Sequence, residues 1–365
     1  MKKTIAVVCG GKSGEHEVSL RSAFYVYNNL DKKKYQVIIL AIDKKGNWFF
    51  GHNFKDLVNT RGLLWKLKPR LEEIVLLKSK NGSQVLSLKK KKIITKINIF
   101  FPLIHGTYGE DGCLQGFFEL LNVPYVGADV IGSAIGMDKE VTKKILMVDK
   151  IPVTKFFIIK REDSLKEKKE KIKTAIKQFD FPLFIKPVSL GSSVGITKVC
   201  SKKDVKRAIK EAFQYDHKII IEKFVKGREI ECSVLGNDNP KASLPGEIKS
   251  VDFYSYKAKY LDEHEAKLLV PAPLDKKQIA QIQKLSIETF KALELKGMAR
   301  IDCFLKSNGQ LIVNEVNTIP GFTQISMYPK LWEVSGIKYS KLLDKLVQLA
   351  IESHNEKNKL RFSYN

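Results

Sequence analysis

The sequence predicts an α/β protein with two or three domains, and three observations lead to this prediction. The chain has 365 residues, which is too long for one ordinary compact core. Residues 4–42 have the pattern strand, glycine turn, helix and strand, which is how an open α/β domain begins. Strand and helix patterns continue to about residue 317, in a globular composition of 44% apolar and 28% charged residues.

Apolar β-branched runs predict strands, and apolar residues with a 3.6-residue period predict helices. On this basis the first part of the chain has a strand at 4–10, a helix at 17–30, strands at 35–42 and 97–104, a helix at 114–121 and a short strand near 124–126. Residues 44–95 are charged and irregular, and their pattern assigns no element. The glycine-containing stretch 127–136 is expected to be a loop.

The second part of the chain continues the alternation. Its expected elements are a helix opened by Met137-Asp138-Lys139, a strand at 154–159, a lysine-rich helix at 164–178 and strands at 183–186, 218–222, 228–236, 299–306 and 310–317. No apolar run approaches the ~18–20 residues needed to span a bilayer. The apolar start at residues 4–9 is too short for a signal peptide and lacks a cleavage site, so we expect a buried first strand.

The five cysteines are scattered and form no C-x-x-C pair, which indicates a reduced, cytoplasmic protein without a disulfide framework or zinc site. The formal charge of +24 raises the possibility of nucleic-acid binding. Lysine supplies most of this charge, and neither arginine forks nor aromatic platforms are concentrated in the sequence. We therefore expect solvated lysine faces, with no nucleic-acid or membrane partner.

The strongest chemical pattern lies in the last two strands. Asn308-Gly309 between two alternating runs predicts a hairpin with a two-residue type I′ turn. In that register Asp302 lies opposite Glu315 and Arg300 lies opposite Asn317, with all four side chains on one face. Carboxylate and amide oxygens of this kind suit Mg²⁺ shared with substrate phosphates. The alternative is an exposed salt-bridge face, which the apolar opposite face of the same strand makes less attractive.

A second pattern follows the strand at 183–186. Gly191-Ser192-Ser193-Val194-Gly195 has the small residues and hydroxyls that allow a backbone to approach phosphates, although such loops are more often ordinary turns. Lys186 at the end of the strand could bridge phosphate oxygens as a point charge. The strand that ends at Glu222-Lys223 leads into a polar step whose backbone could bind an adenine edge, which alone is weak evidence.

Eight ordered segments resemble the D-alanine–D-alanine ligase family of the ATP-grasp class. They are GGKSGEHEVSL, HGTYGEDG, MDK, IKPVSLGSSVGI, EKFVKGREIECSVLG, YSYKAKY, MARIDCF and NEVNTIPGFTQISMYP. The resemblance implies a three-domain ATP-grasp architecture: an open α/β N-terminal domain that binds substrate (1–138), a central ATP-grasp subdomain (139–220) and a C-terminal ATP-grasp subdomain (221–365) with the metal hairpin and the substrate loop. It also implies ATP, two Mg²⁺ ions (or Mn²⁺), two molecules of D-alanine and a homodimer.

The resemblance assigns roles to residues that match the family motifs. The implied catalytic residues are Glu15, Ser192, Tyr260, Arg300 and Ser326. The implied substrate-binding residues are His105, Lys259, Gly321 and Met327. The implied ATP contacts are Lys139, Lys186, Ser193, Glu222, Lys223, Val225 and Glu229, and the implied metal ligands are Asp302, Glu315 and Asn317.

In this scheme Glu15 holds the ammonium of the first D-alanine and His105 lies near its carboxylate. Without the resemblance, Glu15 would be read as a helix first-turn acid and His105 as a loop cap. Related enzymes that make an alanyl-lactate ester resemble this family but have histidine at the position of Tyr260, so the tyrosine favours D-alanine as the second substrate. Three competing hypotheses are an ATP-grasp ligase for different substrates, an inactive nucleotide sensor and a nucleic-acid-binding protein.

Overall fold

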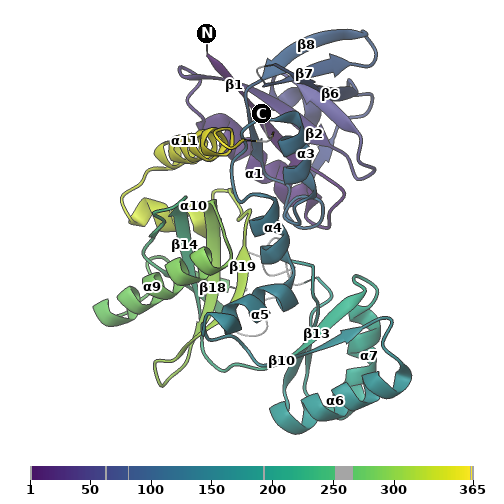
Figure 1. Ribbon diagram of the computed structural model, residues 1–365, viewed down its shortest axis with the longest axis vertical. Helices are drawn as coiled ribbons and strands as arrows, with labels where there is room; N and C mark the ends of the chain where they lie inside the picture. Colours follow the sequence, from purple (N-terminus) through teal and green to yellow (C-terminus); the bar gives the residue numbers. More distant parts are fainter. Residues whose placement is uncertain are drawn as a thin grey trace.

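The structure is a computed structural model that describes residues 2–61, 64–80, 82–191, 194–250, 266–361 and 363. Three α/β units follow one another along the long axis of the molecule (Figure 1). The unit with the N-terminal sheet lies at one end, the C-terminal sheet lies in the middle, and a smaller central sheet lies at the other end. Within the described ranges, no helix combines the length and apolarity needed to cross a membrane.

The N-terminal sheet has the strand order β3-β2-β1-β9. β1 (Lys3–Gly10) runs parallel to β2 (Tyr35–Ile42) and to β9 (Ile99–Pro102), and β3 (Trp48–Gly51) is an antiparallel edge strand. β1 is buried from its second residue onward, as expected for a strand covered on both faces. The sequence predicted these three parallel strands, although β9 is shorter than expected.

The two faces of β1 pack against different elements because its side chains alternate. Ile5, Val7 and Cys9 share a core with α1 (His16–Asn29). Ala6 and Val8 share another core with α3 (Cys113–Leu121). The sequence predicted both helices, at 17–30 and 114–121.

Residues 44–95, whose pattern assigned no element, form several small elements beyond β3. They are α2 (Phe54–Leu57), β4 (Val58–Arg61), β5 (Leu64–Leu67), β6 (Ile74–Ser79), β7 (Gly82–Ser87) and β8 (Lys92–Ile97). β6, β7 and β8 form an antiparallel sheet whose buried residues join the core on the α3 side of β1. These strands are half-exposed, which explains why their sequence shows no clean apolar run.

The central sheet has the order β10-β13-β11-β12, with all pairs antiparallel. Its strands are β10 (Phe156–Lys160), β11 (Leu183–Pro187), β12 (Thr197–Val199) and β13 (Lys218–Lys223). The helices α6 (Leu165–Phe179) and α7 (Lys202–Ala212) contribute apolar side chains to its core. Helix α6 begins with a capping box between Ser164 and Glu167.

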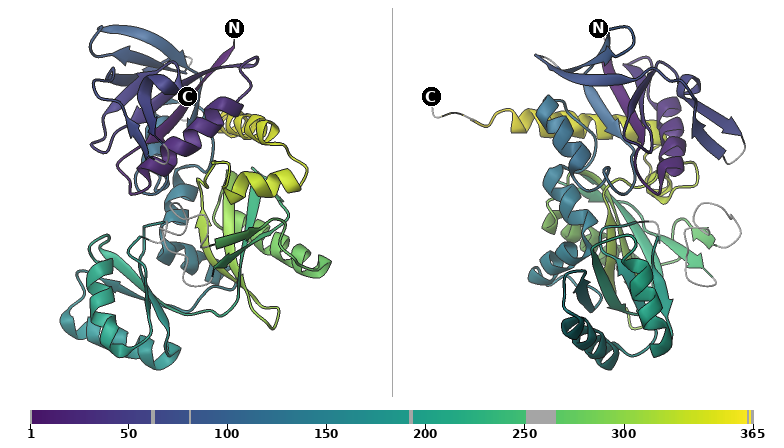
Figure 2. Two further views of the ribbon diagram at one scale, coloured as in Figure 1. Left: turned by 180° about the vertical axis from the view of Figure 1, so that it is seen from behind. Right: turned by 90° about the vertical axis from the view of Figure 1, so that its right-hand side faces the viewer.

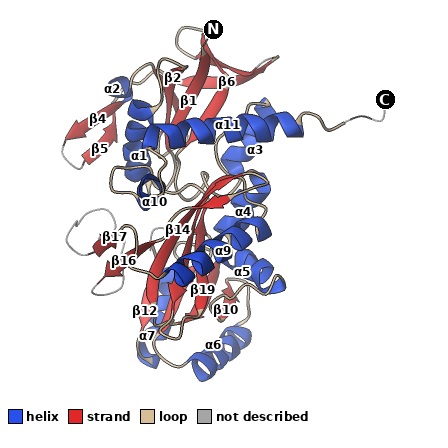
Figure 3. Cartoon of the chain, turned by 90° about the vertical axis from the view of Figure 1, so that its left-hand side faces the viewer, coloured by secondary structure: helices blue, strands red, loops and turns tan. Residues whose placement is uncertain are grey.

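The C-terminal sheet has the order β17-β16-β14-β18-β19, and β15 pairs with β14. Its strands are β14 (Arg228–Gly236), β15 (Lys241–Ala242), β16 (Gly246–Ser250), β17 (Ala266–Leu269), β18 (Gly297–Leu305) and β19 (Leu311–Asn317). Helix α9 (Lys276–Ala292) covers one face of this sheet (Figure 3). Helix α10 (Met327–Val334) lies beside β14.

The last helix joins the C-terminal part of the chain to the N-terminal sheet. Helix α11 (Tyr339–Lys357) lies beside α1, and both views in Figure 2 show it within the N-terminal unit. Its buried leucines share the core of β1 and α1. The core that β1 shares with α1 therefore contains residues from both ends of the sequence.

Two expectations for residues 124–136 were wrong. Residues 124–126 contain only an isolated bridge between Tyr125 and Phe100. The expected loop at 127–136 contains helix α4 (Val130–Met137), whose N-cap Asp129 accepts a hydrogen bond from Gly132 N–H. A Cβ at Gly136 would lie 2.7 Å from Thr318 Cγ2, so this glycine allows close helix packing. Helix α5 (Lys139–Val148) follows directly, as predicted.

Candidate active site

The first wall of the site lies at the carboxyl ends of β1 and β9. β1 lies between β2 and β9. After β1 the chain forms β2 on one side of β1, and it later forms β9 on the other side. Ligands of open α/β sheets bind at such a switch point. Glu15 follows β1 as the N-cap of α1, and His105 follows β9; both are buried and line one cavity.

His105 is held on both sides by groups of the protein. Its Nδ1 lies 2.9 Å from the carbonyl oxygen of Ile319, and its Nε2 lies 3.0 Å from Ser22 Oγ. A carbonyl oxygen only accepts, so Nδ1 carries the proton and Nε2 accepts from the serine. Burial lowers the pKa of His105, which favours this neutral form although Glu15 opposes the shift. The imidazole therefore fastens the loop after β9 to the chain after β19.

Glu110 completes this junction, and reasoning from the sequence missed it. Its Oε2 accepts a hydrogen bond from Gly106 N–H at 2.8 Å, and its Oε1 accepts from Ile319 N–H at 2.8 Å. Burial and the charge of Glu15 raise its pKa to about 7. The only signal in the sequence is an acid inside the glycine-rich loop HGTYGEDG, which does not reveal the partner at residue 319.

The second wall is the polar face of the C-terminal sheet. Asp302 pairs with Glu315 and Arg300 pairs with Asn317, as predicted for the hairpin. The neighbouring strand adds Glu231, which pairs with Asp302 and was not predicted. Three carboxylates thus lie in a row across β14, β18 and β19. The alternation of Glu229 and Glu231 in β14 hinted at this face, but only the sheet pairing shows it.

Arg300 links the carboxylates of this row. Its Nε and Nη2 each donate to one oxygen of Asp302 at 2.7 Å, and its Nε lies 3.1 Å from Glu231 Oε2. Asn317 Nδ2 donates to Asp302 Oδ2 at 2.9 Å. Burial alone would lower the pKa of Arg300, but Asp302 and Glu231 raise it well above its ordinary value. The guanidinium therefore stays charged and keeps a fixed orientation.

The predicted turn of this hairpin was wrong, although the predicted pairing was right. Lys306 N–H donates to Gln310 O and Gly309 N–H donates to Lys306 O, which makes a three-residue loop with Gly309 at φ +82°. A bulge places one extra residue, Asn314, in β19 between Val313 and Glu315. The longer loop shifts the register by one residue, and the bulge shifts it back.

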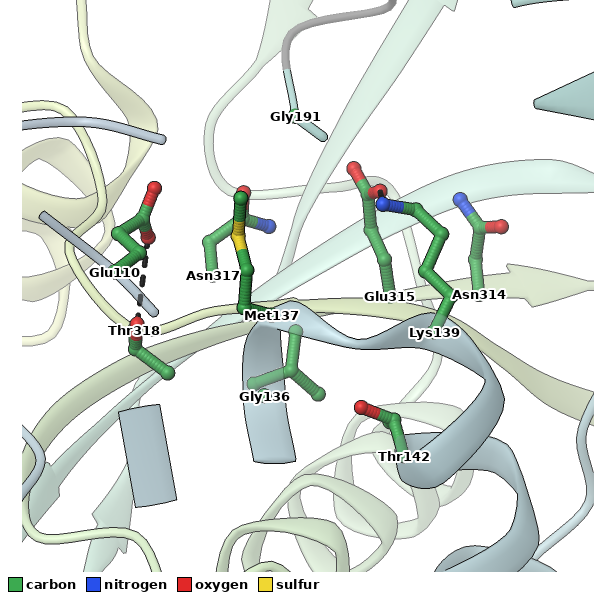
Figure 4. Close-up of a pocket in the computed structure, with 11 residues that line it drawn as sticks. Glu110, Gly136, Met137, Lys139, Thr142, Gly191, Asn314, Glu315, Asn317 and Thr318 are labelled. Atoms are coloured by element: carbon green, nitrogen blue, oxygen red, sulfur yellow. Dashed lines mark hydrogen bonds and ion pairs between the residues drawn. The ribbon is translucent and has the colours of Figure 1, made fainter. Parts of the chain in front are cut away.

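The third wall combines α5 with the central sheet. Lys139 Nζ donates to Leu190 O at 2.6 Å and lies 3.9 Å from Glu315 Oε2. Figure 4 shows the Lys139 and Glu315 side chains directed toward one another. Lys186 Nζ lies 2.5 Å from Glu222 Oε2 in the central sheet. Burial lowers the pKa of Lys139. Burial also acts to lower the pKa of Lys186, but the charge and hydrogen bond of Glu222, together with the charges of Glu315 and Glu229, raise it.

The step after β13 crosses from the central sheet to the C-terminal sheet. Lys223 at the end of β13 is exposed, Val225 is half-buried within the connection, and Glu229 is half-buried at the start of β14. The predicted ATP contacts at these positions therefore follow one another along the link between the two sheets.

Two neighbouring cavities bring together nine of the fifteen predicted site residues that the structure describes; Lys186, Glu222, Lys223, Val225, Glu229 and Asp302 line neither. The first is lined by the predicted residues Glu15, His105, Arg300, Asn317, Gly321, Ser326 and Met327. The second is lined by the predicted residues Lys139, Glu315 and Asn317 (Figure 4). Glu110, Gly191 and Asn317 line both cavities, so the two lie next to each other at these residues.

The loop after β19 is tightly built. Ser326 is the N-cap of α10, and its Oγ accepts from Thr323 N–H at 2.9 Å. A Cβ at Gly321 would lie 2.7 Å from Ser326 Oγ, so only glycine allows this approach. The predicted residues Ser192, Ser193, Lys259 and Tyr260, and with them the segment 254–260, lie outside the described residues.

Comparison with known proteins identifies the family. The model for the D-ala D-ala ligase N-terminus matches residues 4–128, and the model for the C-terminus of the same ligases matches residues 145–348. The D-alanine–D-alanine ligase of a Thermoanaerobacter species is 48% identical over 358 residues, which are 98% of each chain. The chain belongs to the D-alanine–D-alanine ligase family. It is an enzyme of that activity, as the sequence predicted.

Solved structures agree with this membership. The D-alanine–D-alanine ligase from Coxiella burnetii has a TM-score of 0.84 and 39% identity, and the match covers 98% of this chain and 96% of that one. The VanG D-Ala:D-Ser ligase from Enterococcus faecalis has a TM-score of 0.82 and 35% identity, covering 96% of this chain and all of that one. The ATP-grasp α/β fold expected from the sequence is confirmed.

Proposed function

We propose that this ligase joins two D-alanines through a D-alanyl phosphate formed from ATP, and that the product serves peptidoglycan precursor synthesis. The observation that carries the proposal is the pair of adjacent cavities. One contains Glu15 and Arg300, which suit an amino-acid substrate, and the other contains Lys139 and Glu315, which suit phosphate and metal. A reaction that transfers phosphate to a substrate carboxylate needs these two environments side by side.

We place ATP between the central and C-terminal sheets. Lys139 and Lys186 would bind phosphate oxygens, and the Gly191–Gly195 loop with Ser192 and Ser193 would close over them. The connection between the two sheets supplies the remaining nucleotide contacts. These are Glu222, Lys223 and Val225 toward the adenine, and Glu229 toward the ribose.

The hairpin face fits a magnesium site shared with phosphates. Across the described ranges, no three His, Cys, Asp or Glu side chains form a complete metal-binding cluster. Asp302, Glu315 and Asn317 instead offer two carboxylates and one amide, a partial oxygen set of the kind that Mg²⁺ completes with phosphate and water. Two Mg²⁺ ions, or Mn²⁺ in their place, would neutralise charge on the phosphates.

The remaining residues act on the substrates. Glu15 would hold the ammonium of the first D-alanine, with His105 keeping the neighbouring loop in place near its carboxylate. Arg300 and a backbone N–H near Gly321 would stabilise the oxyanion when the second D-alanine attacks, a kind of interaction worth about 3–4 kcal/mol. Ser326 and Met327 would contact the second D-alanine. Ser192 would anchor Tyr260, which lies beside Lys259 in the substrate loop.

We further propose three domains at 1–138, 139–220 and 221–365, which follow the three main sheets except that β13 (Lys218–Lys223) of the central sheet extends past residue 220. We propose a cytoplasmic homodimer that requires no nucleic acid and no membrane. Five free cysteines support a reducing compartment.

The test is ADP release with ATP and Mg²⁺, with the products separated by chromatography. D-alanine alone should give D-alanyl-D-alanine, whereas L-alanine should give no turnover. D-lactate and D-serine, each added with D-alanine, should not compete as second substrate. Preferred formation of a mixed product would assign the enzyme to another acceptor, and nucleotide binding without turnover would favour a sensor.

A further inference from the structure

Lys143 is a buried charged residue that none of the roles above uses. It lies on α5 one turn after Lys139, and its side chain is 1% exposed. Its Nζ lies 2.8 Å from Glu222 Oε1 and donates to the carbonyl oxygen of Asn314 at 3.1 Å. Burial lowers the pKa of Lys143, so these two partners have to offset the cost of keeping an ammonium there.

The two partners of Lys143 belong to different sheets. Glu222 lies in β13 of the central sheet, and Asn314 is the bulge residue of β19 in the C-terminal sheet. Asn314 directly precedes Glu315, whose side chain faces the proposed metal position. One ammonium on α5 thus connects both sheets between which the nucleotide would lie.

Lys143 also shares Glu222 with Lys186. Each lysine contacts a different oxygen of the carboxylate, at 2.8 Å for Lys143 and 2.5 Å for Lys186. Burial would raise the pKa of Glu222, but the two lysines lower it to about 2. Without Lys143, the buried carboxylate would have Lys186 as its remaining lysine partner. Because Lys186 Nζ already lies 2.5 Å from Glu222, a Lys186 that turned toward phosphate oxygens would then leave the buried carboxylate without either lysine.

We propose that Lys143 is a positioning residue for nucleotide binding. Its ammonium holds the Glu222 side chain of the central sheet and the Asn314 bulge next to Glu315, and it leaves Lys186 available to phosphate. This inference rests on the proposed ATP site. It assigns Lys143 no contact with either D-alanine, because the cavity proposed for the amino acids lies around Glu15 and Arg300 instead.

The experiment compares Lys143→Met with Lys144→Met in the full-length protein. Lys144 is the next residue of the same helix, its replacement removes the same charge, and its side chain is 63% exposed where it pairs with Glu140. Binding of ATP with Mg²⁺ is measured by isothermal titration calorimetry, and the KM values for ATP and D-alanine are measured by ADP release. Circular dichroism checks that each variant is folded.

Lys143→Met should weaken ATP binding by about 10- to 100-fold, the effect of losing a contact worth about 1.4–2.8 kcal/mol. The KM for D-alanine should stay within threefold, and Lys144→Met should match the unchanged enzyme in every measurement. A structural role alone would reduce the amount of folded enzyme without changing the Kd for ATP. Unchanged ATP binding in folded Lys143→Met overturns the proposal.

A double-mutant cycle with Glu222→Gln tests the route through Glu222. If Lys143 acts through Glu222, the double variant should bind ATP no more weakly than Glu222→Gln alone. Independent, additive losses overturn this step. Should Lys143→Met fail to fold, Lys143→Arg is used for the same test. The larger, planar guanidinium of arginine cannot keep both contacts of the lysine ammonium, so Lys143→Arg should still weaken ATP binding. Failure of the unchanged enzyme to bind ATP would instead reject the proposed function.

Discussion

Glu110 gives the sharpest prediction about pH, because it is a buried carboxylate next to another one. Its pKa is raised from 4.5 to about 7 by burial and by Glu15. Each pKa unit corresponds to about 1.4 kcal/mol, so the raised value makes the ionised form about 3 kcal/mol less favourable in the folded protein. The perturbation that removes this effect is Glu110→Gln, which keeps the shape and stays neutral.

The sign follows from proton binding. Between pH 4.5 and 7 the folded protein holds a proton on Glu110 that the unfolded chain has lost. The stabilisation by this proton is complete below pH 4.5 and disappears as the pH rises through about 7. For these two pKa values, about 2–3 kcal/mol of unfolding free energy is lost between pH 5 and pH 8.

The assay is urea unfolding at pH 5, 6, 7 and 8, followed by fluorescence and by circular dichroism. The unchanged protein should lose about 2–3 kcal/mol more than Glu110→Gln over this range. Glu162→Gln is the matched control, since the Glu162 side chain is 71% exposed, and it should keep the pH dependence of the unchanged protein. Equal pH dependence in Glu110→Gln and the unchanged protein would refute the argument, because Glu110 would then be ionised already at pH 5.

Three further predictions concern the reaction. Arg300→Lys keeps the charge but loses the fork that binds Asp302, so kcat should fall about 10²- to 10³-fold in the ADP-release assay, with little change in the KM for ATP. Asp302→Asn should lower kcat/KM at least about 100-fold and shift the Mg²⁺ titration to higher concentration; an unchanged titration would contradict its role as a ligand. Gly321→Ala should lower kcat about tenfold or more, because its Cβ would meet Ser326 Oγ at 2.7 Å and Thr323 N–H holds that hydroxyl in place; normal steady-state kinetics would show that the loop tolerates the shift.

The hairpin shows how far local patterns reach. Alternation along β18 and β19 places Asp302, Glu315 and Asn317 on one face, whatever the rest of the chain does. The turn and the bulge were not predictable in the same way. Val313 N–H donates to Pro152 O, and Lys143 donates to Asn314 O, so groups more than 150 residues away accompany the bulge. The predicted register was right because two deviations cancel.

The sequence by itself determined the family, the strands and helices that have a clear apolar period, and the residues whose motifs match known ligases. These features depend on periodicity and on ordered motifs, both of which are local along the chain. The elements within residues 44–95 were not predicted, because half-exposed strands lack a clear apolar period.

Only the tertiary structure decided the roles of Glu110, Glu231 and Lys143. Glu110 meets Ile319 across 209 positions of sequence, and Lys143 meets Asn314 across 171. A buried charge is acceptable only where folding supplies its partners, and no local pattern states which distant backbone group or carboxylate will be there. The sequence contains the charged residues, and the packing of three sheets determines which of them meet.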